Sequence, residues 1–252
     1  MVLEGEQTTT FGEPSNFRYK RAPIFLIRHG DRAVSKAYEI SKQNKVRQLK
    51  EKADYDRATV HEILDSALIA SVGFVQDGQP VVVPMLFGRE GETVFLHGAR
   101  KARVIRLLEG TTTACLNVTH VDGLVYARSA FNSSMNYRSV TVFGKPRLVE
   151  GTDEKLHALR VIAESTMPGR WGEVRDSHIN EIKKTGVIAL EIESASAKVA
   201  NAMPKDEEED YDIPIWAGVL PLVSAFTALR SDDRLLDGVE PSAVVKAMQG
   251  RV

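Results

Sequence analysis

The sequence has one cysteine, no long apolar run and almost no net charge, and each absence excludes a class of protein. With Cys115 as its single thiol, the chain cannot form an internal disulfide framework or a multi-cysteine metal site. No stretch reaches the roughly 18 successive apolar residues of a membrane span. The 33 basic and 34 acidic residues nearly cancel, so no overall field favours nucleic acid or a membrane as the main partner.

Short catalytic and metal signals are also scarce. The histidines show no metal-type spacing, and we find no nucleophile elbow, zinc signature or dinucleotide glycine fingerprint. The acidic N-terminus lacks the basic start and apolar stretch of a signal peptide, so we expect a cytoplasmic protein. Cys115 lies in an apolar run, which favours a buried, inert thiol over a nucleophile.

Composition divides the chain into three parts. Residues 1–54 are expected to form an arm and then a charged, solvent-exposed helix over residues 35–56, a stretch without proline or glycine. Residues 55–200 are rich in β-type runs. Residues 201–252 contain an acidic run, residues 206–210, which we expect to be a solvated loop. A tail follows whose apolar residues should dock on something.

The middle part predicts a mainly β fold with flanking helices. We expect strands over residues 68–75, 79–87, 93–96, 113–119, 124–128, 137–150 and 186–192, and helices over 59–67, 104–108, 153–166, 173–184 and 243–248. Asp77-Gly78 and Asp122-Gly123 indicate hairpins, and Gly144 and Pro146 should bend the long strand. Because hairpins dominate and βαβ alternation is missing, the sheet should be antiparallel and close into a small barrel.

One candidate ligand segment, residues 96–103, joins a strand to a helix. Gly98 allows a tight turn, Ala99 leaves room for a ligand, and Lys101 and Arg103 precede or open the helix. Free N–H groups and the helix dipole favour an anion there, and arginine can hold a phosphate with two hydrogen bonds. The alternative is an ordinary strand-to-helix turn with surface basic residues.

A second candidate segment, residues 128–140, is unusually dense in hydrogen-bonding side chains for a stretch between two half-buried strands. Its polar residues are Arg128, Ser129, Asn132, Ser133, Ser134, Asn136, Tyr137, Arg138 and Ser139. They could contact a planar heterocycle, or they could form a polar loop at the barrel rim. Trp216 in the tail could stack on a flat ring or anchor the tail.

A third motif, Arg28-His29-Gly30, is similar to the signature of histidine phosphatases. Such enzymes are α/β domains, whereas hairpins follow here, so the context disfavours this interpretation.

Residues 55–222 resemble the pyridoxamine 5′-phosphate oxidase-like family, in its flavin-nucleotide-binding, nitroimidazole-resistance-protein-like branch. The resemblance rests on short motifs in the same order along the chain. They include Val72-Gly73-Phe74, Asp77-Gly78-Gln79-Pro80, Val83-Pro84-Met85, Leu96-His97-Gly98-Ala99, Ala127-Arg128-Ser129, Asn136-Tyr137-Arg138-Ser139 and Trp216-Ala217-Gly218.

The resemblance implies an antiparallel split β-barrel over residues 55–200 and a homodimer with FMN at the subunit interface. Val83, Pro84 and Met85 would line the flavin ring, and His97, Gly98, Ala99, Lys101 and Arg103 would hold the phosphate. The rest of the pocket would comprise Arg128, Ser129, Asn132, Asn136, Tyr137, Arg138, Ser139 and Trp216. NAD(P)H is a possible electron donor, a small organic molecule the substrate, and His97 and Tyr137 are the candidates for proton transfer.

Four departures from the family pattern, some covering more than one residue, all remove polar, basic or ionisable groups. Ala102 replaces a serine, and Asn132 and Ser133 replace two histidines. Residues 200–202 replace an Arg-Thr-Gly triplet, and Ser71 replaces a histidine. The sequence therefore leaves two readings open. One is an FMN-dependent oxidoreductase. The other is a divergent member with weakened or lost FMN binding that acts as a small-ligand-binding protein or a non-redox enzyme.

Overall fold

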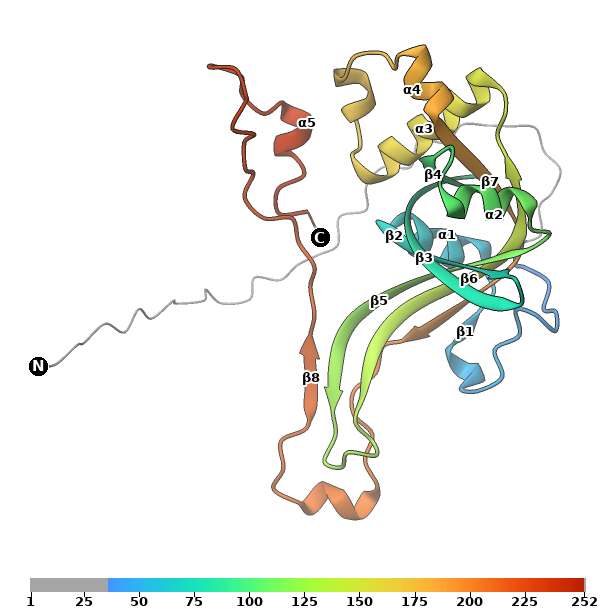
Figure 1. Cartoon of the computed structure of the whole chain (residues 1–252). Coiled ribbons are helices and arrows are strands. Elements are labelled where there is room, and N and C mark those ends of the chain that lie inside the picture. The colour runs from blue at the N-terminus through green and yellow to red at the C-terminus, as the bar shows by residue number, and fades with distance from the viewer. Residues whose placement is uncertain (1–35, 252) are drawn as a thin grey trace, which may run out of the picture. The chain divides into compact units, whose positions relative to one another are not determined.

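The computed structural model describes residues 36–251. The expected N-terminal arm and the Arg28-His29-Gly30 motif lie outside the described residues. Figure 1 shows the elements in chain order. The strands are β1 (Ala53–Asp54), β2 (Ile69–Gln76), β3 (Gln79–Glu90), β4 (Thr93–Ala99), β5 (Ala114–Tyr126), β6 (Ser134–Leu148), β7 (Thr185–Ala200) and β8 (Gly218–Pro221). The α-helices are α1 (Arg57–Asp65), α2 (Arg103–Gly110), α3 (Thr152–Thr166), α4 (Ile179–Lys184) and α5 (Ala243–Lys246). Three short 3-10 helices are η1 (Lys50–Lys52), η2 (Arg170–Glu173) and η3 (Glu208–Asp212).

Strand pairing closes a ring. The hydrogen-bonded order is β7-β4-β3-β2-β5-β6, and β6 pairs with β7 again, with every pair antiparallel. Strand β1 adds to β7, and β8 adds to β5. The β2–β3 hairpin turns at Asp77 and Gly78, whose φ angles of 50° and 74° are those that an Asp-Gly turn adopts. The predicted antiparallel, barrel-like β fold is therefore confirmed.

The core fills the inside of the ring through the period-2 alternation of each strand. Leu96, Leu116 and Val140 point inward together with α1 and α2 residues such as Leu64 and Leu108. Helix α3 covers part of the outer side of the sheet, where it crosses β3 at Gly88. A Cβ on Gly88 would lie 2.7 Å from the Ile162 Cα, so only glycine permits this approach.

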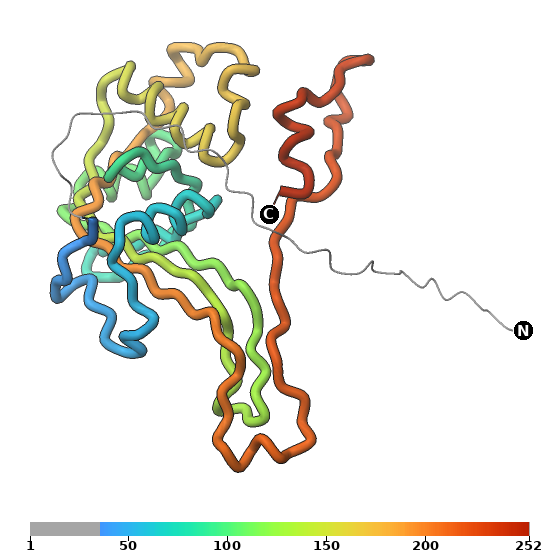
Figure 2. Tube along the Cα trace, turned by 180° about the vertical axis from the view of Figure 1, so that it is seen from behind, coloured from blue at the N-terminus to red at the C-terminus, as the bar shows by residue number. Residues whose placement is uncertain are grey.

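Beyond the ring, β5 and β6 continue as a long hairpin. We call this extension, with the segment that returns along it, the arm: residues 120–136 and 201–222. Residues 123–125 of β5 pair on one side with β6, and residues 123–126 pair on the other side with β8. The 3-10 helix η3 lies at the far end (Figures 1 and 2). The chain then turns back, and Ser242 at the N-cap of α5 donates to Glu173 of η2 over 2.8 Å.

Four local predictions are wrong in whole or in part. Residues 36–56 do not form the predicted helix, and only the short 3-10 helix η1 lies among them, because tertiary contacts override local propensity. Tyr38 is buried, and the Asn44 Nδ2 donates to the carbonyls of Glu39 and Ala195 over 2.9 and 3.0 Å. Asp122-Gly123 is not a hairpin, because β5 runs through it with a register shift.

The third prediction, that the acidic run over residues 206–210 is a solvated loop, is correct only in part. Glu207–209 are exposed, but Asp206 is buried against Arg128. The fourth is the predicted helix over residues 173–184, of which the structure forms only Glu173 at the end of η2 and the separate α4. The bend at Gly144 coincides with a register shift between β6 and β7, and α5 confirms the predicted helix near residue 243.

Candidate functional site

A row of side chains on the outer face of the sheet forms the centre of the candidate site. Because core residues alternate with outward ones, Pro84, Ser71, Asn117 and Thr141 all face away from the core. They are directly paired neighbours across β3, β2, β5 and β6. Four strands thus present one contiguous strip of outward side chains, polar except for Pro84 at one end, which we call the outer face.

Hydrogen bonds orient the amide at the middle of the outer face. Asn117 Nδ2 donates to the Val140 carbonyl and to Thr141 Oγ1, both over 3.1 Å, and Asn117 Oδ1 accepts from Thr119 Oγ1 over 3.0 Å. The strip continues to Tyr137 and Ser139 of β6, both half-buried. Such an array of fixed donors and acceptors suits the edge of a planar polar heterocycle.

His97 lies on the same side of the sheet as the outer face. Leu96 and its partner Phe87 point into the core, so His97 on β4 faces outward. The His97 Nδ1 is buried and has no hydrogen-bond partner among residues 36–251. Burial lowers the pKa of the imidazole, so His97 is neutral at pH 7. A buried ring nitrogen without a partner is costly and points to a bound group that would satisfy it.

The strand-to-helix segment beside His97 keeps the features expected of an anion site. Helix α2 begins at Arg103, and its N-cap, Ala102, supplies no capping side chain. Lys101 and Arg103 are exposed and have no ion-pair partner in the described part of the chain. Gly98 serves packing: a Cβ there would lie 3.3 Å from Ile105 of α2. Free N–H groups and two unpaired cations therefore meet at one helix terminus.

Strand alternation separates other predicted residues from the outer face. Val83 packs on the core and Met85 belongs to it, so of that triplet only Pro84 faces outward. Asn136 is buried and exchanges two 3.0 Å hydrogen bonds with the backbone of Ala202. Arg138 makes a bidentate pair with Asp122 at 2.8 and 3.0 Å.

The remaining predicted residues lie in the arm. Arg128 pairs with Asp206, Ser129 Oγ accepts from the Asn132 N–H, and Trp216 contacts Tyr126. From Asn117 to Tyr126 the chain advances by nine strand residues, which is about 30 Å at roughly 3.3 Å per residue, and Arg128 follows beyond the strand. The predicted site residues thus fall into two groups within one chain. The group on the barrel comprises Pro84, His97, Lys101, Arg103, Tyr137 and Ser139. The group on the arm, distant from the first, comprises Arg128, Ser129, Asn132 and Trp216.

Sequence reasoning missed the side chains of Asn117, Thr119 and Thr141, and it named Ser71 only as a departure from the family pattern. Their signal was the alternation of polar and apolar residues in β5 and β6, which shows that one strand face is uncovered.

Other histidines among the described residues are already engaged or lie apart. His61, His120 and His157 hydrogen-bond neighbouring side chains, and His178 is the N-cap of α4. Within residues 36–251, no group of three or more His, Cys, Asp or Glu side chains is arranged to hold a metal ion, and no helix is both long and apolar enough to cross a membrane.

Comparisons with known proteins agree with this fold. The model of the family described as pyridoxamine 5′-phosphate oxidase matches residues 56–199. The flavocytochrome Anf3 from Azotobacter vinelandii is 38% identical, with a TM-score of 0.78 over 83% of this chain and 97% of that one. The FAD and heme binding protein from Mycobacterium smegmatis is 34% identical, with a TM-score of 0.76 over 79% and 98%.

A candidate 5-nitroimidazole antibiotic resistance protein from Bacteroides thetaiotaomicron is 25% identical, with a TM-score of 0.50 over 58% and 86%. No curated protein matches the chain.

Proposed function

Because the chain belongs to the pyridoxamine 5′-phosphate oxidase family, we propose that it binds a flavin nucleotide on the outer face and acts as an oxidoreductase on a small organic substrate. The observation that carries this proposal is the row of outward side chains from Pro84 to Thr141, together with the unpartnered Nδ1 of His97 on the outer side of β4. Two solved structures more than 30% identical to the chain are a flavocytochrome and an FAD and heme binding protein.

In this proposal the outer face holds the ring and the α2 terminus holds the phosphate. The hydroxyls of Ser139 and Thr141 can donate to ring nitrogens and carbonyls, and Asn117 Oδ1 keeps a lone pair that can accept from a ring N–H. Lys101 and Arg103 neutralise the phosphate charge. A bound flavin supplies hydride-transfer chemistry, with NAD(P)H as the proposed donor. His97, neutral because of its burial, can accept a hydrogen bond or a proton from the ligand, and the Tyr137 hydroxyl can donate one.

We further propose a cytoplasmic homodimer. The barrel residues and the arm residues of one chain lie too far apart to touch one flavin. They can share a flavin if the arm of a second copy brings Arg128 and Trp216 to the barrel. Residues 55–200 would then be the flavin domain, and residues 201–252 the segment that docks on the partner.

The direct test is the absorption spectrum of the purified protein, before and after incubation with FMN or FAD. A yellow chromophore at about one per subunit is expected, and chromatography after denaturation identifies it as FMN or FAD. The matched variants are S71A and N117A on the outer face, with Q76A, on the same strand as Ser71, as the control. Only the first two should weaken flavin binding.

A colourless protein that binds neither FMN nor FAD would refute this function. It would favour the alternative in which the lost polar groups, including the serine hydroxyl absent at Ala102, have emptied the flavin site. The search would then turn to other small ligands and to non-redox chemistry.

A second candidate function is binding of haem together with the flavin. His97 is the described histidine whose imidazole is free of hydrogen bonds, half-buried and turned toward the outer face. A neutral imidazole is a common axial ligand of haem iron, and haem would supply one-electron chemistry. Protein expressed with added haem precursor should show a Soret band that H97A lacks and H120A keeps. A wild-type protein without that band, or an H97A variant that retains it, would contradict this candidate.

A further inference from the structure

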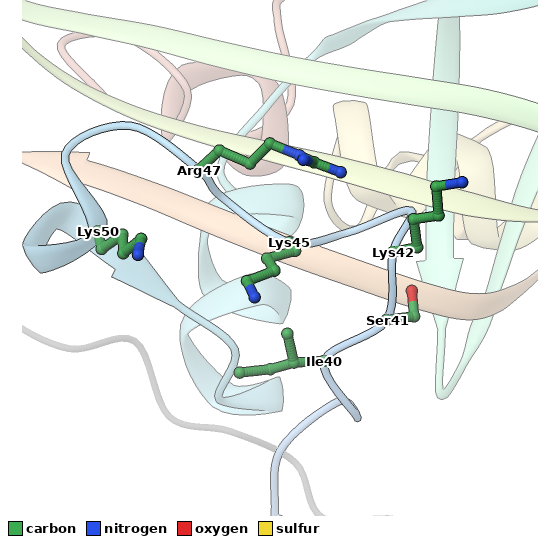
Figure 3. A pocket seen from close by; sticks show the side chains of 6 residues that line it. All are labelled: Ile40, Ser41, Lys42, Lys45, Arg47 and Lys50. Atoms are coloured by element: carbon green, nitrogen blue, oxygen red, sulfur yellow. The ribbon is translucent and has the colours of Figure 1, made fainter.

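Four basic side chains surround a concave surface that the proposed flavin site does not use. The segment before β1 forms a concavity of about 510 Å³, lined by Ile40, Ser41, Lys42, Lys45, Arg47 and Lys50 (Figure 3). We call it the basic pocket. Two carboxylates of the same segment, Glu39 and Glu51, do not line it. The pocket is therefore strongly positive, although the chain as a whole carries a net charge of −1.

The cations of the basic pocket are unpaired and their backbone is fixed. Within residues 36–251, none of the four makes a hydrogen bond or an ion pair through its side chain. The buried Asn44 ties the segment to Ala195 of β7, and the Val46 N–H donates to Tyr55 Oη over 2.9 Å. Like charges held close together on an anchored loop repel one another, so a binding partner that carries negative charge would be stabilised there.

The end of the arm carries the opposite charge. Glu207, Glu208, Glu209 and Asp212 form what we call the acidic tip, and all four are exposed without an ion-pair partner in the described part of the chain. The tip is anchored by Asp206, whose side chain is fully buried and accepts from the Arg128 N–H and Nη1 over 2.8 and 3.0 Å. Tyr211 packs on the same guanidinium at 4.9 Å.

The arm also exposes apolar side chains beside the acidic tip. They are Tyr211, Ile213, Ile215, Trp216, Leu220 and Leu222, each at least 41% exposed. A contiguous apolar strip of this kind marks a surface that a partner covers. Because the acidic tip lies next to this strip, we expect the partner surface that covers the strip to have basic side chains beside it.

We propose that the acidic tip of one copy docks in the basic pocket of a second copy, and that the arm thereby clasps its partner. The inference rests on the proposed homodimer. A symmetric dimer makes the contact twice, so each copy contributes one acidic tip and one basic pocket. Charge complementarity between two anchored, unpaired groups of the same chain favours this occupant over a small phosphorylated ligand, which would leave the acidic tip unexplained.

Charge reversal tests the contact with two matched variants, K42E/K45E/K50E and E207K/E208K/E209K. Exposed pairs each change an equilibrium constant by a factor of roughly 1.5 to 5, so either variant should raise the dimer Kd at least tenfold at low salt. The effect should shrink in 0.5 M NaCl because of screening. A variant with both reversals should return to within about threefold of wild type. E150K/D153K/E193K, which reverses three exposed acids elsewhere, should leave the Kd unchanged.

Mixing the two variants gives the sharpest result. In a mixed dimer, the unchanged acidic tip of one variant meets the unchanged basic pocket of the other, and the reversed tip meets the reversed pocket. Both contacts are then complementary, so an equimolar mixture should dimerise more tightly than either variant alone. Circular dichroism checks that each variant is folded.

Unchanged dimer Kd values, or a mixture that stays monomeric, would overturn the proposal. So would a pocket that binds inorganic phosphate while the E207K/E208K/E209K variant dimerises normally. A monomeric wild-type protein in light scattering would instead refute the homodimer itself, which separates the two failures.

Discussion

Glu92 is the residue whose replacement we expect to reveal an acid-sensitive part of the stability. Its carboxylate accepts from Tyr38 Oη over 2.7 Å and pairs with His61 Nε2 at 3.2 Å and with Arg57. Arg57 also lies 4.0 Å over the ring of Tyr38, which is buried. One carboxylate therefore joins the segment before β1 and helix α1 to the β3–β4 turn, and E92Q removes its charge.

The size of the effect follows from the pKa of Glu92. Partial burial raises this pKa, but hydrogen bonds from His61, Tyr38 and Arg57 outweigh burial and hold it at about 2, against 4.5 in the unfolded chain. At about 1.36 kcal/mol for each pH unit, the difference of about 2.5 sets a ceiling of about 3.4 kcal/mol. A third of the side chain is exposed, so solvent screening reduces the expected contribution to about 1–2 kcal/mol.

The sign of the pH dependence follows from the lowered pKa. The folded state binds this proton less readily than the unfolded state does, so the stabilisation is complete above about pH 4.5 and is lost as the pH falls toward about 2. Urea unfolding at pH 7, 5 and 3 should show E92Q less stable at pH 7, with the gap to wild type closing at pH 3.

A control variant is E90Q, which removes an exposed carboxylate paired with His157 and should cost less than about 1 kcal/mol at pH 7. Equal gaps at pH 7 and pH 3 for E92Q would refute the reasoning, because they would show that the charge of Glu92 is not what stabilises the fold.

Three further predictions concern the arm, the barrel and the ligand site. D206A leaves Arg128 without its buried partner and should weaken the arm by about 2–3 kcal/mol, seen as faster hydrogen exchange in residues 203–215; unchanged exchange would contradict it. G144A places a Cβ 1.9 Å from the Glu191 carbonyl oxygen and should cost more than about 3 kcal/mol in urea unfolding, whereas G110A, with open space around it, should be nearly neutral. K101A/R103A should raise the flavin Kd at least tenfold without a change in Tm, and an unchanged Kd would remove both cations from the site.

Much of the barrel was predictable because its information is local. Alternating residues mark β2 through β6, Asp77-Gly78 fixes one hairpin, and the Gly144 bend is visible in the sequence. The segment before β1 was not predictable from local pattern. Its conformation depends on Asn44 reaching Ala195, a contact 151 residues away along the chain.

The same distinction explains the candidate site. The strand-to-helix segment at Lys101 and Arg103 is contiguous in sequence, and so it could be found there. The outer face combines Pro84, Ser71 and Asn117 from separate strands, and only the strand register shows that they are neighbours. The hairpin predicted at Asp122-Gly123 is wrong because Gly123 permits close packing and not a turn. A Cβ on Gly123 would lie 2.9 Å from the Leu220 carbonyl oxygen of the adjoining β8.

The late position of strand β7 in the sequence has a consequence for how the chain folds during its synthesis. It pairs with β4, with β6 and with β1, whose partner residues Ala53 and Lys198 lie far apart in sequence, so the ring cannot close before the chain has passed Ala200. At about 5–20 residues per second, the ribosome needs roughly 5–20 seconds to move from the end of β4 to that point. During this interval the β4 edge that β7 will cover has no partner, and neither does the β6 edge once β6 has been made. The nascent chain is then most open to wrong pairing, and folding limited by such distant contacts is slow.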